Sequence, residues 1–310
     1  MREHDHPARG RNAIIRKLKE IMVEKHWQII LIDRFINLCN KDTFFVTGDP
    51  ERTEPLPIED LLWSESSSHA DLQGFIDAAP SLDTPFNITV GQLARECQIS
   101  HLAGHVVQHV FDPVLDPRFN TEEAVQLERT LRAYLPLLSN EELKIGKYCG
   151  AYGMCNSSLF ILYEYMLSRN PDNAFERHRV QQSIEETAFG ALNFAAAAYA
   201  DREGNYPSDV FSPYLPHSLC QAAMVYHRLW TQSGHIVYKQ RLDKLKAIIG
   251  NLAKRWTIAC KLIRADESRM YIINGSLTER QGIISRLLIS LISDWNSSIS
   301  LRHTLPSVLQ

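Results

Sequence analysis

The feature that most constrains the fold is an unbroken series of amphipathic segments between residues 101 and 256. Apolar residues recur there at steps of three and four, which places them on one face of a helix. The clearest stripes cover residues 124–138 and 238–263, and no segment shows the alternation of a half-buried strand. The pattern predicts an all-α fold, organised as an irregular array of many helices.

Capping and turn residues predict where the helices begin and end. Two Asp-Pro turns at residues 112–117 stop one helix, and Asn120 is the expected N-cap of the next, with Glu123 placed for a capping box. Ser139 is expected to open a further helix that ends near Arg169. The other expected helices cover residues 12–38, about 90–109, 173–200, about 212–230, 238–263 and 277–295.

Two stretches lack helical periodicity. Residues 40–85, rich in Pro and Ser, form an irregular segment that is either functional or packed across the helices as a belt, and residues 201–216 form a second loop. We expect three regions in the chain: a divergent N-terminal extension (1–22), a helical regulatory domain (23–263), and a divergent C-terminal helix and tail (264–310).

Composition excludes several classes of protein. The net charge of −3 over 310 residues gives no basic field of the kind that binds nucleic acid by electrostatics alone. The six cysteines are scattered, which indicates reduced thiols in an intracellular protein and not a disulfide framework. No apolar run has the length of a membrane span or the position of a secretion signal, so we expect no membrane association.

Common catalytic motifs are missing from the sequence. It contains no Gly-x-Ser-x-Gly elbow, no Gly-x-Gly-x-x-Gly turn and no phosphate-binding Gly-x-x-x-x-Gly-Lys loop. Paired glutamates at 122–123 and 141–142 are explained by helix capping. We therefore predict no catalytic residues and no cofactor.

Three histidines, His101, His105 and His109, lie at four-residue steps and are expected on one helical face, a spacing that allows two imidazoles to share a zinc ion. A metalloprotease helix would carry Glu where Leu102 and Val106 stand. No acidic or cysteine ligand is linked to the triplet by its position in the sequence. Histidines at a helix surface or core edge are the more frequent explanation, so the sequence alone predicts no metal site.

Aromatic and polar side chains on the central helices suggest a ligand pocket. We take His105, Tyr152 and Tyr226 as its candidate residues, because pockets between helices are frequent ligand sites in helical folds. Core packing explains the same residues equally well.

Residues 23–38 combine a tryptophan, Trp27, with the pair Asp33-Arg34, and this segment resembles a helix in the regulatory domain of fungal zinc-cluster (Zn2Cys6) transcription factors. Residues 56–63 resemble the Leu-Pro…Trp segment of that family. Residues 107–138 are similar to its Asp-Pro turns and following helix, and residues 212–230 and 252–259 to its later helices. The five segments occur in the family's order.

The resemblance implies a transcriptional regulator of a fungal metabolic or secondary-metabolite gene set, located in the nucleus, with the cytoplasm as the alternative. The family's zinc cluster uses close Cys-x-x-Cys pairs that this sequence lacks, so we expect no direct DNA binding by this chain alone. The family's opening helices are also missing or replaced. We therefore expect an uncovered apolar face and a homodimer or a partner transcription factor, with a small-molecule effector as a further expected ligand.

The alternative function is enzymatic. A helical scaffold freed from DNA binding can be recruited for a cyclisation or isomerisation in a biosynthetic pathway, because such chemistry needs only a shaped pocket with a few polar groups.

Overall fold

The computed structural model describes residues 7–40, 45–57, 80–85, 88, 90–145, 150–169, 172–200 and 211–253. Regular structure in these residues consists of α-helices without a β-strand, so the predicted all-α fold is confirmed. The helices are α1 (Pro7–Asn40), α3 (Gln92–Phe111), α4 (Pro117–Ile145), α5 (Ala151–Arg169), α6 (Ala174–Ala200), α7 (Tyr214–Ser233) and α8 (Ile236–Leu252).

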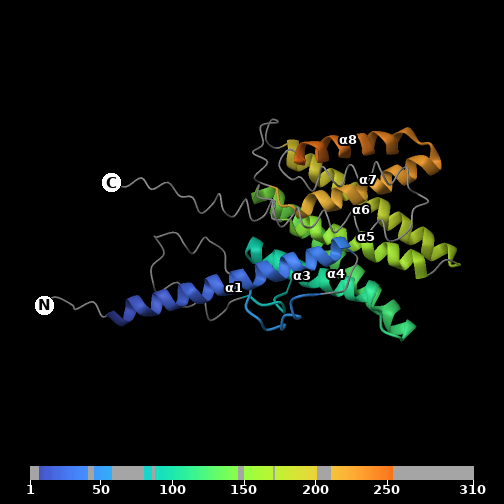
Figure 1. Cartoon of the computed structure of the whole chain (residues 1–310). Coiled ribbons are helices and arrows are strands. Elements are labelled where there is room, and N and C mark those ends of the chain that lie inside the picture. Colours follow the sequence, from blue (N-terminus) through green and yellow to red (C-terminus); the bar gives the residue numbers. More distant parts are fainter. Residues whose placement is uncertain are drawn as a thin grey trace.

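Helix α5 forms the centre of the array. It packs against α3, α4, α6 and α7, and every residue from Ala151 to Tyr163 is buried. A helix buried on all sides needs apolar or small residues all round, which explains why α5 lacks a polar face. Figure 1 shows α7 and α8 on one side of α5, with α1 and α3 on the opposite side.

The segment of residues 45–57 packs on α1. Trp27, which is completely buried, donates its indole N–H to the carbonyl of Pro55 at 2.9 Å, and Leu56 next to it is also buried. A backbone hydrogen bond of 2.7 Å joins Leu56 N to Pro80 O. The described part of the long irregular segment therefore packs across a helix, as one of the two sequence-based interpretations expected.

The predicted start of α4 is wrong. The helix begins at Pro117, and the carboxylate of Asp116 accepts the N–H of Arg118 at 2.9 Å, so Asp116 precedes the helix and Asn120 lies within its first turn. Proline is favoured at this first helical position because its missing N–H is not needed there. Glu123 does not form a capping box; its carboxylate lies 2.7 Å from His109 on α3.

The predicted helix from Ser139 to Arg169 is wrong in its start and in its continuity, whereas its end at Arg169 is confirmed. Ser139 lies inside α4, which continues past Pro136 to Ile145, and α5 starts separately at Ala151. Gly150 marks the break with a φ of 103°, a left-handed conformation that glycine adopts without strain. Glu142, at the end of α4, caps α5 by accepting the N–H of Tyr152 at 2.9 Å.

The remaining helices agree with the predictions within a few residues. Asn173 caps α6 by accepting the N–H of Glu176, and Gly234 separates α7 from α8. The expected continuation of the last stripe to residue 263 and the helix at 277–295 lie outside the described residues. The described cysteines, Cys39, Cys97, Cys155 and Cys220, form no disulfide with one another. No described helix has the length and apolar character that crossing a bilayer requires.

Candidate functional site

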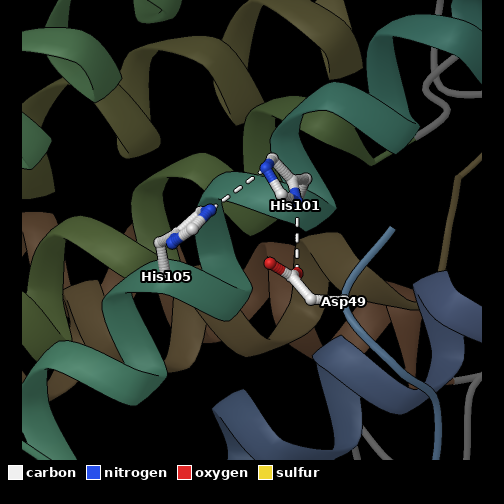
Figure 2. A group of neighbouring side chains, drawn as sticks. All are labelled: Asp49, His101 and His105. Carbon is white, nitrogen blue, oxygen red and sulfur yellow. Dashed lines mark hydrogen bonds and ion pairs between the residues drawn. The ribbon is translucent and has the colours of Figure 1, made fainter. Parts of the chain in front are cut away.

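The candidate site combines two histidines of α3 with an aspartate of the 45–57 segment (Figure 2). His101 and His105 stand one turn apart on α3, and their rings meet edge to face at 86° with 4.4 Å between the ring centroids. Their Nε2 atoms are 3.0 Å apart. The four-residue spacing seen in the sequence therefore does bring this pair together.

Asp49 reaches the histidines because α1 holds the chain on either side of Thr47. The carboxylate of Asp33 accepts the backbone N–H groups of Val46 and Thr47, and the guanidinium of Arg34 donates to the Gly48 carbonyl at 2.9 Å. Asp49 follows directly, and its Oδ1 lies 3.5 Å from Nδ1 of His101. The buried Asp33-Arg34 pair thus positions the acidic member of the site.

Arg34 in turn packs against α3. A Cβ added to Gly104 would lie 2.8 Å from Cδ of Arg34, so the glycine leaves the room that the arginine side chain occupies. Glycine at this position lets α1 and the 45–57 segment approach the turn of α3 that carries the histidines.

The three side chains form a set that can hold a metal ion. One ligand atom from each of Asp49, His101 and His105 lies within 4.8 Å of the other two. Imidazole nitrogens with a carboxylate oxygen suit zinc and the neighbouring first-row divalent ions, with positions left open for water or a ligand. Half of the Asp49 side chain is exposed, so the site is open to solvent.

His101 is held in its neutral form. Burial, together with the charges of His105, Arg34 and Arg52, lowers its pKa to about 4 against the opposing effect of Asp49. Neutral imidazole is the form that binds metal ions. Nδ1 of His101 is buried and has no hydrogen-bond partner among the described residues.

His109 does not join the other two histidines. Eight residues rotate an α-helix by about 80° beyond two full turns, so its side chain leaves the face of His101. His109 is buried, pairs with Glu123 at 2.7 Å, and packs edge-on against the ring of Tyr165 with 5.0 Å between centroids. Its role is to join α3 to α4 and α5.

The residues taken as a pocket occupy three different neighbourhoods. His105 lies with His101 and Asp49, whereas Tyr152 stacks on Phe194 of α6 with 4.0 Å between ring centroids. Tyr226 is buried beneath Arg241, and burial raises its pKa to about 12. The contacts of the two tyrosines are those of core packing, and a shared pocket stays a prediction.

Ser157 and His217 form a close pair that no sequence motif predicts. Nδ1 of His217 on α7 lies 2.9 Å from the Ser157 hydroxyl on α5. The distance suits a nucleophile and its base, but Ser157 is completely buried between packed helices, where a substrate cannot reach it. The pair therefore joins α5 to α7.

Asp49 is the residue that sequence reasoning missed. It belongs to the irregular segment, where no periodicity indicates which helix it meets. The turn Gly48-Asp49-Pro50 is visible in the sequence, but its attachment to α1 depends on contacts between residues far apart in the chain.

Comparisons of the chain with models of protein families, with curated proteins and with solved structures found no match. The resemblance to fungal zinc-cluster regulators is therefore carried by the five sequence segments alone, and stays a prediction.

Proposed function

We propose that the protein is a transcriptional regulator, with a helical array that acts as a regulatory domain and a partner protein that makes the contact with DNA. The proposal takes its family from the resemblance of residues 23–38, 56–63, 107–138, 212–230 and 252–259 to the fungal zinc-cluster factors. The genes under its control would be a metabolic or secondary-metabolite set, and its site of action the nucleus.

One observation gives the proposal its structural support. The tryptophan helix and the Leu-Pro segment are two of the resembling pieces. Trp27 of the first donates to the carbonyl of Pro55, the residue just before the second, and Leu56, which opens the second, is buried. Asp33 and Arg34, the acidic-basic pair of the first piece, are both buried and tie the intervening chain to α1. Trp27 and Leu56 thus belong to one hydrophobic core, which supports the interpretation of the two segments as parts of one domain.

A regulatory role also suits the chemistry of the described core. In the close serine–histidine pair described above the serine is completely buried, and the tyrosines Tyr152 and Tyr226 serve packing. A regulatory domain needs surfaces for a partner and a means of transmitting a signal, and a buried nucleophile adds nothing to either.

A tethering experiment tests the proposal. The full chain is fused to a DNA-binding domain of known target, and a reporter gene under that target is measured against the DNA-binding domain alone. We expect the fusion to change reporter expression, and a fusion carrying Trp27→Ala, which breaks the docking described above, to lose the effect. A folded, nuclear fusion that leaves the reporter unchanged would argue against the proposal.

A further inference from the structure

We propose that Asp49, His101 and His105 bind a divalent first-row transition-metal ion of the Zn²⁺ type, which fastens the 45–57 segment to α3. The inference goes beyond the proposed function and stands on its own geometry: the site can bind metal whether or not the protein regulates transcription.

The positions of the histidines are close to those of a bound state. In a tetrahedral zinc site with Zn–N distances of about 2.1 Å, two ligand nitrogens lie roughly 3.4 Å apart. The Nε2 atoms of His101 and His105 are 3.0 Å apart, so small side-chain rotations suffice to admit an ion. Because both histidines come from one helix, their relative placement is set by the backbone of α3 before any metal arrives.

A second observation points the same way. In the described structure Nδ1 of His101 is buried without a hydrogen-bond partner, and the nearest carboxylate oxygen, on Asp49, is 3.5 Å away. Asp49 therefore forms no hydrogen bond with His101 that a metal ion would have to replace, and its half-exposed carboxylate is available as the third ligand.

The charges around the site set the strength of binding. Arg34 lies 3.7 Å from Asp49 and opposes a cation, but its closer carboxylate is Asp33, at 3.1 Å. Asp33 therefore neutralises Arg34 and leaves Asp49 available as the anionic member of the set. The mixture of two nitrogen donors and one oxygen favours Zn²⁺, Co²⁺ or Fe²⁺ over Mg²⁺ or Ca²⁺, which take oxygen ligands.

The competing explanation needs no metal. One imidazole donates a hydrogen bond to the other through the facing Nε2 atoms, and Asp49 pairs at the surface with Arg34. The two explanations differ in what happens when a metal ion is added to the full-length protein.

The test is titration of the full chain, first treated with a chelator, with Zn²⁺ by calorimetry and with Co²⁺ by visible absorption. We expect one ion to bind per chain, with a cobalt spectrum that lacks a thiolate-to-metal band. His105→Ala should weaken binding by at least about 100-fold, and Asp49→Asn by about 10- to 100-fold, as losses in a ligand shell do. His178→Ala, at an exposed histidine of α6, is the matched control and should bind like the wild type.

Two results would overturn the proposal. One is a wild-type chain that binds neither ion. The other is a His105→Ala variant with an unchanged circular dichroism spectrum that binds metal as tightly as the wild type, which would place the metal elsewhere. A variant that has lost its helical spectrum is replaced by His105→Gln, which keeps a polar side chain of similar length, and the same two criteria apply. An absence of metal binding would not change the outcome of the reporter experiment, so the metal site and the regulatory function can be refuted independently.

Discussion

Asp33 accepts two hydrogen bonds from Thr47, one from the backbone N–H at 2.9 Å and one from the side-chain hydroxyl. The same carboxylate lies 3.1 Å from the buried guanidinium of Arg34. A single side chain of α1 thus fixes the path of the 45–57 segment and balances a buried charge. Several properties of the protein depend on this anchor.

Replacing Asp33 with alanine should cost about 3 to 5 kcal/mol of unfolding free energy, because it leaves the buried Arg34 without its nearest counter-charge. Urea unfolding measures the loss. Asp243→Ala is the matched control, since Asp243 pairs with Lys239 at 3.1 Å on the exposed surface of α8 and should change stability by less than about 1 kcal/mol. If the two substitutions lowered the unfolding free energy equally, Asp33 would have no special role in anchoring the 45–57 segment.

Trp27→Phe should destabilise the protein by about 1 to 3 kcal/mol, because it removes the donor to Pro55 O and leaves space in the core. Trp27→Ala should cost more, about 3 to 5 kcal/mol. The neighbouring His26→Ala, at a half-exposed side chain paired with Glu54, should have an effect below about 1 kcal/mol. If Trp27→Phe proved neutral in chemical denaturation, the indole hydrogen bond would have no part in docking the segment.

Gly104→Ala and Gly250→Ala should have opposite effects, although both positions lie inside helices. At Gly104 the new Cβ meets Arg34 Cδ at 2.8 Å, and overpacking of this kind costs about 1 to 3 kcal/mol. At Gly250 nothing lies within 4 Å, so the higher helix propensity of alanine should stabilise by up to about 1 kcal/mol. Thermal unfolding of the two variants measures both effects on stability. Two stabilising substitutions would mean that Arg34 is free to move aside.

The buried carboxyl of Glu96 should make the unfolding free energy decrease as pH rises. Burial, and then the charge of Glu142, raises the pKa of Glu96 well above its ordinary value of 4.5. The folded state therefore favours the protonated carboxyl. Its contribution to stability is complete below the unfolded pKa and is lost as pH rises through the higher folded pKa.

Glu96→Gln should remove this loss, because glutamine stays neutral throughout. Unfolding free energies measured between about pH 5 and about pH 8 should decline more steeply for the wild type than for the variant, because the folded carboxyl holds its proton more tightly than the unfolded one. Parallel curves would show that Glu96 ionises in the folded protein as easily as in the unfolded chain.

The sequence predicted local features of the fold well and distant contacts poorly. The apolar stripe from Ala124 to Leu138 and the turn at Gly234 depend on neighbouring residues, and both appear in the structure. The start of α4 was misplaced because Asn120 and Asp116 are both good caps, and only the actual path of the chain shows that Pro117 takes the first helical position.

In the candidate site, too, local spacing could be predicted from the sequence and distant contacts could not. The four-residue step between His101 and His105 predicted their proximity correctly, but the next step to His109 failed because helix rotation carries that ring to Glu123. Asp49 could not be predicted at all. Its place is decided by the contacts of Asp33 and Arg34 with Thr47 and Gly48, and no spacing in the sequence records such contacts.

Deleting the gene and profiling transcripts and metabolites from the same cultures tests the central claim, that the protein regulates transcription, most directly. We predict a coordinated change in a set of transcripts, with metabolite changes that follow from it. Unchanged transcripts together with the accumulation of a single intermediate would contradict the regulatory account, and would assign the helical scaffold to an enzyme.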